Sequence, residues 1–171
     1  MAAHQAAVEN IRTRCCIAGG GPAGMMLGLL LARAGVEVIV LEKHADFLRD
    51  FRGDTVHPST LEVMHELGLL EEFLKRPHDE MQRFDAQIGS EQLTVADLTH
   101  LPTQCKFVAL MPQWDFLNFI AEHARRYPGF QLRTEAAVTD LIFDGERVAG
   151  VKVQTPQGAL EVCAAPVIGA E

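Results

Sequence analysis

Near the N-terminus, three glycines have the spacing of a phosphate-binding turn. Gly19, Gly21 and Gly24 follow a short apolar run at residues 14–18 and precede a longer one at residues 25–34. In such a set the first glycine permits a tight turn, the second lets a pyrophosphate approach the backbone, and the third lets a helix pack on a strand. The helix would then direct the positive end of its dipole at the phosphates. The spacing predicts a dinucleotide-binding loop.

A carboxylate follows at the position where the ribose of a dinucleotide would lie. Glu42 ends a second apolar run, residues 36–41, and stands eighteen residues after Gly24. A carboxylate there can accept hydrogen bonds from both hydroxyls of an adenosine ribose, and its charge would repel a 2′-phosphate. We therefore expect this pocket to disfavour NADP. The alternative is a glycine-rich turn in another kind of α/β protein, with an acidic residue nearby by chance.

The elements that must position these residues form a strand, a helix and a second strand. Pro22 suits the first turn of a helix, because its missing N–H costs nothing there, and Gly35 suits the position just after the end. Residues 14–18 and 36–41 are expected to be buried parallel strands, joined by a right-handed crossover.

The rest of the chain continues to alternate between helical and strand patterns. Helices are expected from Pro58 to Gly68 and over residues 113–126, and another short turn of helix over residues 69–75. Strands are expected over residues 84–88, 93–98, 107–111, 130–134, 138–143, 148–153, 160–164 and 166–169. Asp144-Gly145 between two of them is a hairpin turn signal. The predicted fold class is therefore α/β, a Rossmann-like domain whose parallel sheet is interrupted by a β-meander at residues 138–164.

Length and composition agree with one globular domain. The chain has 171 residues, of which 48% are hydrophobic and 22% charged, as in ordinary folded proteins. Residues 1–11 are expected to be a flexible lead, and residues 12–171 the domain. The net charge of −8 disfavours nucleic acid as a partner.

The sequence also gives expectations about cellular location and metal binding. No apolar run approaches the ~18 residues of a membrane span, and residues 1–10 lack the apolar segment of a secretory signal. We expect a cytoplasmic protein with reduced, mostly buried cysteines, because Cys15, Cys16, Cys105 and Cys163 form no CxxC pair. Neither these cysteines nor the histidines have the spacing of metal ligands, so no metal site is expected.

Several stretches together resemble the flavoprotein aromatic hydroxylases, the FAD monooxygenases related to para-hydroxybenzoate hydroxylase. They are Gly-Gly-Gly-Pro-Ala-Gly with its apolar helix, Val-x-Val-Ile-Val-Leu-Glu-Lys, Phe51-Arg52-Gly53-Asp54, and Met111-Pro112-Gln113-Trp114. The resemblance implies that Arg52 reaches the FAD and that Gln113 contacts its ribityl chain. The cofactor-binding residues that it implies are Gly19, Gly21, Ala23, Gly24, Glu42, Lys43, Arg52 and Gln113. No catalytic residue is identified.

The resemblance implies the N-terminal part of a monooxygenase in which NAD(P)H reduces FAD and a small aromatic substrate is hydroxylated. The family's Gly-Ala-Asp-Gly reads Gly169-Ala170-Glu171 here, and its riboflavin-binding motif and substrate-covering sheet have no counterpart. We therefore expect a domain truncated at its C-terminal end, inactive alone, whose unpaired sheet edge favours self-association. Two alternatives stay open: a dinucleotide-binding domain without catalysis of its own, and another FAD or NAD oxidoreductase with the same opening motif. The lack of a CxxC pair disfavours a disulfide reductase.

Overall fold

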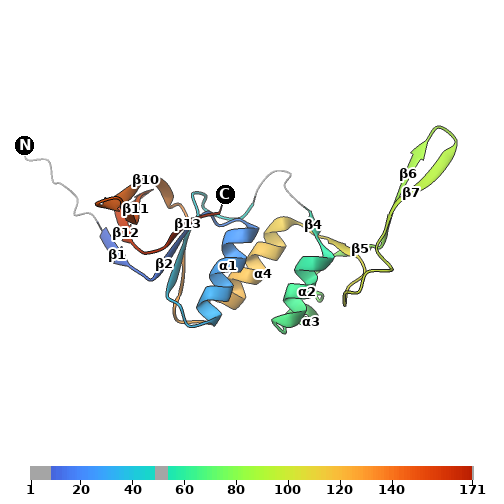
Figure 1. The fold of residues 1–171 in the computed structure, drawn as a ribbon, viewed down its shortest axis with the longest axis horizontal. Coiled ribbons are helices and arrows are strands. Elements are labelled where there is room, and N and C mark those ends of the chain that lie inside the picture. Colours follow the sequence, from blue (N-terminus) through green and yellow to red (C-terminus); the bar gives the residue numbers. More distant parts are fainter. Residues whose placement is uncertain (1–8, 49–53, 171) are drawn as a thin grey trace, which may run out of the picture. The chain divides into compact units, whose positions relative to one another are not determined.

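The computed structural model describes residues 9–48 and 54–170 of the chain (Figure 1). These residues belong to two compact units, one comprising residues 1–48 and 117–171 and the other residues 49–116. The first unit contains the glycine-rich loop, and the second is inserted between two neighbouring strands of the first. The single range predicted for the domain, residues 12–171, covers the second unit and the first unit from residue 12 onward.

A parallel sheet is the centre of the first unit. The strand β2 (Cys15–Ala18), the helix α1 (Pro22–Arg33) and the strand β3 (Val38–Leu41) follow one another as predicted. The sheet has the order β13-β2-β3-β9, where β13 is Val167–Gly169 and β9 is Phe130–Arg133. Every pairing in this sheet is parallel, which confirms the predicted α/β architecture.

A second sheet of the first unit is the predicted meander. The strands β10 (Ala137–Asp144), β11 (Arg147–Thr155) and β12 (Gly158–Cys163) pair antiparallel in sequence. Gly145 in the turn between β10 and β11 has φ +63°, which glycine adopts at little cost. The hairpin signal therefore predicted this turn correctly.

Part of the expected N-terminal lead is ordered. Residues 9–11 lie in the strand β1 (Glu9–Arg12), which pairs in parallel with β12, while residues 1–8 lie outside the described part. Ile11 pairs with Val162 and packs against the core of the meander. One apolar residue in a polar stretch is too weak a pattern to predict a strand, and the pairing partner lies about 150 residues away along the chain.

The parallel sheet is covered on both faces. One face meets the meander in a cluster of buried residues from both sheets: Cys16, Ile39, Leu41, Ala136, Val151, Val153, Leu160, Val162 and Ala164. The other face meets α1, where Gly28 lies so close to Val40 and Phe130 that an added Cβ would come within 2.8 Å and 3.0 Å of their side chains. Burial on both faces explains why β3 reads as a continuous apolar run.

The second unit contains two helices and a small antiparallel sheet. The helices α2 (Pro58–Glu66) and α3 (Leu70–Phe73) follow the prediction. The sheet has the order β4-β8-β5, with bounds Thr55–Val56 for β4, Val108–Leu110 for β8 and Asp79–Met81 for β5. The sequence predicted β8 alone of these, because β8 lies in an apolar run, whereas β4 and β5 have one apolar residue each and show no period. The helix α4 (Gln113–Ala124) follows β8, and its bounds span both units.

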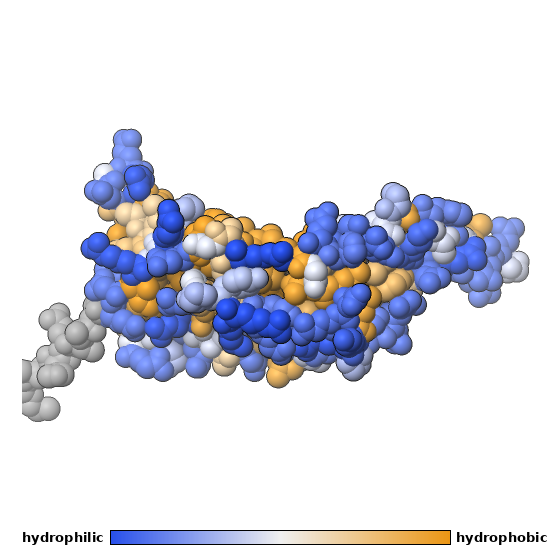
Figure 2. Space-filling view, turned by 90° about the horizontal axis from the view of Figure 1, so that it is seen from below, coloured by the Kyte–Doolittle hydropathy of each residue, from blue (hydrophilic) through white to orange (hydrophobic). Residues whose placement is uncertain are grey.

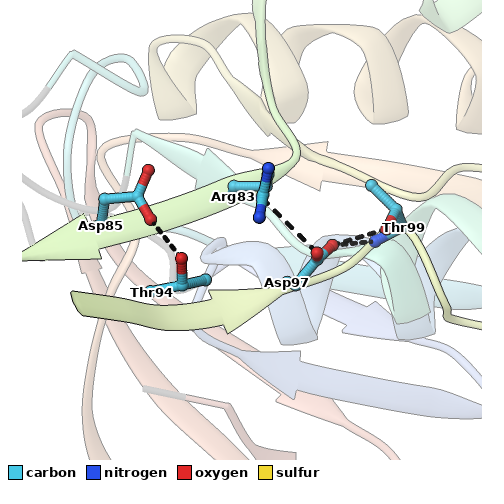
Figure 3. A network of polar contacts seen from close by, with 5 residues as sticks. All are labelled: Arg83, Asp85, Thr94, Asp97 and Thr99. Carbon is cyan, nitrogen blue, oxygen red and sulfur yellow. Dashed lines mark hydrogen bonds and ion pairs between the residues drawn. The ribbon is translucent and has the colours of Figure 1, made fainter. Parts of the chain in front are cut away.

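A two-stranded hairpin, β6 (Arg83–Ile88) and β7 (Glu91–Asp97), completes the second unit. Its surface in Figure 2 is mostly hydrophilic on the face shown, with a few apolar groups. Figure 3 shows the polar pairs that join its strands, in which Thr94 donates to Asp85 and Arg83 pairs with Asp97.

Among the described residues, the structure contains no helix that is both long and apolar enough to cross a membrane.

Candidate functional site

The loop between β2 and α1 begins with an unusual backbone conformation. Gly19 has φ +118°, a region that residues with a Cβ rarely adopt. Its N–H donates to the carbonyl of Leu41 at the end of β3, 2.9 Å away. The positive φ turns the chain out of β2, and this hydrogen bond holds the turn against the neighbouring strand.

The start of α1 is left open to an anion. Gly21 is the N-cap residue and Pro22 stands in the first turn, where no side chain of the described residues caps the helix and no acidic residue occurs. The first N–H groups of a helix have no partner within it, and the helix dipole makes this end positive. A twelve-residue helix with such an end provides a binding site for a phosphate group.

The three motif glycines meet different surroundings. A Cβ on Gly24 would collide with the carbonyl oxygen of Gly19, a backbone atom that cannot swing aside, and would lie 3.3 Å from the Cβ of Ala170. Among the described residues, a Cβ on Gly21 would meet only the carbonyl of Ala170, at 3.9 Å. Packing within the chain therefore requires glycine at position 24, whereas the space in front of position 21 is open.

Glu42 completes the site from the end of β3. Its side chain is 7% exposed. The Gly20 N–H donates to its Oε2 at 3.0 Å, and the His44 N–H donates to its Oε1 at 2.9 Å. A Cβ on Gly20 would lie 2.8 Å from the Cβ of Glu42, so the loop and the carboxylate are closely packed. Each carboxylate oxygen of Glu42 is thus held by a backbone N–H.

The structure brings five of the predicted residues to one place in the first unit. Gly19, Gly21, Ala23, Gly24 and Glu42 lie where the neighbouring parallel strands β2 and β3 end, which is where α/β sheets bind ligands. The roles assigned to these residues stay predictions.

The other three predicted residues are placed differently. Lys43 follows Glu42 and is exposed. Gln113 is half-buried at the start of α4, in the second unit. Arg52 lies outside the described residues.

Sequence reasoning missed Gly20 and His44. Both act through backbone N–H groups, so their side chains give no signal of the contact. The glycine between Gly19 and Gly21 was a usable signal for Gly20, because a Cβ at this position would enter the space of Glu42.

The cysteines are free, and three of the four are buried. Burial raises the pKa of Cys16 to about 12, with the neighbouring Cys15 adding to the shift. A thiol with so high a pKa is not a nucleophile near neutral pH. Within residues 9–48 and 54–170, no three histidine, cysteine or acidic side chains gather in a way that could hold a metal ion.

Comparisons with known proteins agree on one family. The family model described as FAD binding domain matches residues 12–171. The chain is 31% identical over 163 residues to a 6-methylpretetramide 4-monooxygenase of Streptomyces rimosus, covering 95% of this chain and 39% of that protein. It is 34% identical over 143 residues to a rifampicin monooxygenase of Streptomyces venezuelae, covering 83% and 28%.

Solved structures give the same picture. The p-nitrophenol 4-monooxygenase of Pseudomonas putida DLL-E4 superposes with a TM-score of 0.80 at 27% identity, covering 96% of this chain and 42% of that one. The anhydrotetracycline hydroxylase of Streptomyces rimosus gives 0.79 at 29% identity, covering 94% and 32%. These similarities confirm the predicted Rossmann-like fold class. The chain spans less than half the length of each of these four proteins.

Proposed function

Because the chain belongs to the FAD binding domain family, we propose that the β2–α1 loop and Glu42 hold the ADP half of FAD. The enzyme that we propose is an NAD(P)H-dependent monooxygenase acting on an aromatic compound. One observation carries the binding proposal: the buried carboxylate of Glu42 is hydrogen-bonded to the backbone of the glycine loop. That bond brings the acceptor for a ribose next to the donors for a pyrophosphate.

The phosphate half of the proposal rests on the loop. The open space at Gly21 lets an oxyanion approach the backbone, and the N–H groups at the start of α1 would donate to it. Ala23 stands in this first turn and is exposed, with a side chain small enough to leave the approach free. No cationic side chain is needed, because the helix end supplies the positive potential.

The ribose half rests on Glu42. With each carboxylate oxygen fixed by a backbone N–H, the side chain is held in one orientation. Two ribose hydroxyls can donate to it, while a 2′-phosphate would place negative charge beside negative charge. Lys43 is proposed to accompany Glu42 at the adenosine end. Arg52 and Gln113 are proposed to contact FAD and its ribityl chain, as the family resemblance implies.

The activity of the complete enzyme is proposed from the relatives. Their names describe monooxygenases of 6-methylpretetramide, rifampicin and p-nitrophenol, which supports oxygen insertion into an aromatic compound. When bound, FAD supplies the redox chemistry and the activation of oxygen. The described residues of this chain supply binding and orientation. A cytoplasmic location is proposed on the free thiols, of which three are buried.

Titration of the chain with FAD, followed by flavin fluorescence, tests the binding proposal. ADP should compete with FAD, because the loop and Glu42 hold the ADP half. FMN lacks the adenosine and should not compete at the same concentration. Adenosine 2′,5′-bisphosphate should compete at least about tenfold more weakly than ADP, because of charge repulsion at Glu42. Absence of FAD binding, or equal competition by FMN and ADP, would overturn the proposal.

A further inference from the structure

The turn between β9 and β10 contains a residue in an uncommon conformation. Glu135 has φ +52°, and it is the one residue other than glycine with a positive φ among the residues that the structure describes. The left-handed region is disfavoured for residues with a Cβ, and strongly so for β-branched ones. Such a conformation persists where the surrounding contacts hold it.

Backbone hydrogen bonds connect this turn to Glu42 and His44. The N–H of Glu42 donates to the carbonyl of Arg133 at 2.8 Å, and the carbonyl of Glu42 accepts from the N–H of Ala136 at 2.9 Å. The N–H of Glu135 donates to the carbonyl of His44 at 2.9 Å. His44 in turn donates its own N–H to Oε1 of Glu42.

The conformation of Glu135 aims two successive donors at the segment that follows β3. Its own N–H reaches His44, and the next N–H, from Ala136, reaches Glu42. Ala136 is buried, whereas the side chain of Glu135 is exposed. The contribution of Glu135 therefore lies in its backbone conformation rather than in packing of its side chain.

We propose that Glu135 is a positioning residue for FAD binding. Its left-handed conformation directs its N–H to the carbonyl of His44, which holds that residue in place, and the His44 N–H orients the Glu42 carboxylate toward the ribose. The inference rests on the proposed function, since the orientation of Glu42 matters only if a ribose binds there. It adds to that function a residue that acts through the main chain of His44.

The test compares substitutions that differ in how well they tolerate positive φ. Glu135→Val places a β-branched residue in the turn and should raise the Kd for FAD about tenfold. Glu135→Gly accepts the conformation freely and should stay within about twofold of the wild-type Kd. Glu146→Val is the matched control, because it removes an exposed glutamate from the turn between β10 and β11. It should leave the Kd unchanged.

A second background separates positioning from general stability. In Glu42→Ala, the carboxylate is gone, so Glu135→Val should cause no further loss of FAD affinity. Circular dichroism melting of each variant reports folding independently. If Glu135→Val does not fold, Glu135→Ala replaces it with an expected rise in Kd of about threefold, because alanine tolerates the left-handed region better than valine does.

Different failures have different meanings. Failure of the wild-type chain to bind FAD would overturn the proposed function, and this inference with it. Unchanged affinity in folded Glu135→Val would overturn the inference alone. An equal loss of FAD affinity in Glu135→Gly would also overturn the inference, because it would assign the effect to the side chain. So would an undiminished effect of Glu135→Val on FAD affinity when it is combined with Glu42→Ala.

Discussion

Every residue of β3 in the parallel sheet is buried, whereas most residues of the β6–β7 hairpin are exposed. The sheet has α1 on one face and the meander on the other, and its strand ends lead directly into the glycine loop and Glu42. The strands of the hairpin are joined by surface pairs such as Thr94 with Asp85 (Figure 3). Both are regular β-structure, but their residues are fixed by different forces.

This difference predicts where single substitutions should change folding or FAD binding. Around the parallel sheet a side chain meets backbone atoms and buried apolar groups that cannot move without cost. On the hairpin a side chain meets solvent and other exposed groups, where substitutions change little. Substitutions at the loop should therefore alter folding or FAD binding strongly, and substitutions in the hairpin should alter local properties only.

The largest effect is expected for Gly24→Ala. Its Cβ would collide with the backbone carbonyl of Gly19, so α1 or the loop must shift. We expect a loss of about 3 kcal/mol in the free energy of unfolding, at the upper end for overpacking, together with loss of FAD binding. Urea denaturation measures the first quantity. Gly169→Ala is the matched control, because a Cβ there meets no atom of the described residues within 4 Å, and it should stay within about 0.5 kcal/mol.

The next effect separates binding from folding at a neighbouring glycine. Gly21→Val adds its side chain to space bounded by the carbonyl of Ala170, and the extended φ of −71° and ψ of −178° suit valine. The free energy of unfolding should change by less than about 1 kcal/mol. FAD binding should fall at least about 100-fold, because the pyrophosphate needs that space. A folded Gly21→Val chain that still binds FAD tightly would show that the loop does not hold the phosphates.

A smaller effect is expected at Glu42. Glu42→Ala removes the acceptor for the N–H groups of Gly20 and His44, which should cost about 1–3 kcal/mol in stability. FAD affinity should fall about tenfold through the lost ribose contact. The preference for ADP over adenosine 2′,5′-bisphosphate should also shrink, since the repelling charge is gone. Glu146→Ala, an exposed glutamate in a turn, should change none of these. An unchanged Kd for FAD in Glu42→Ala would contradict the proposed role.

The same difference decides how much the sequence could predict. The motif glycines, Glu42, α1 and the strands of the parallel sheet were predictable because burial and steric demand leave a clear residue pattern. The strands β1, β4 and β5 were not, since each is short and contains a single apolar residue, which gives no pattern. The hydrogen bonds from Gly20 and His44 to Glu42 were also not predictable, because their donors are backbone N–H groups. Sequence patterns record side-chain requirements, and here the carboxylate is oriented by the main chain.

The smallest effect is expected at the end of the hairpin, where Asp97 meets Thr99 and Arg83 (Figure 3). The Thr99 hydroxyl donates to Oδ1 of Asp97 at 2.6 Å, and the Thr99 N–H donates to the same oxygen at 3.0 Å. These bonds lower the pKa of Asp97, and the hydroxyl has the larger effect. The Nε of Arg83, 3.5 Å from Oδ2 of Asp97, lowers the pKa further. The pKa of Asp97 is therefore lower in the folded than in the unfolded state. The stability that these bonds contribute is fully present at pH above the unfolded pKa and is lost as pH falls through the folded pKa.

Thr99→Val tests that contact with little change of shape. Without the hydroxyl, the pKa of Asp97 should move up toward its ordinary value, and carboxyl carbon NMR over an acid titration measures the midpoint. Asp140 is the internal control, because its pKa is lowered chiefly by the N–H of Leu141 and should not move. FAD affinity should stay as in the wild type, since the substitution lies at the end of the hairpin, just after β7. A changed FAD affinity in this variant would show that the hairpin and the loop are energetically coupled, and the contrast between the two regions would fail at that point.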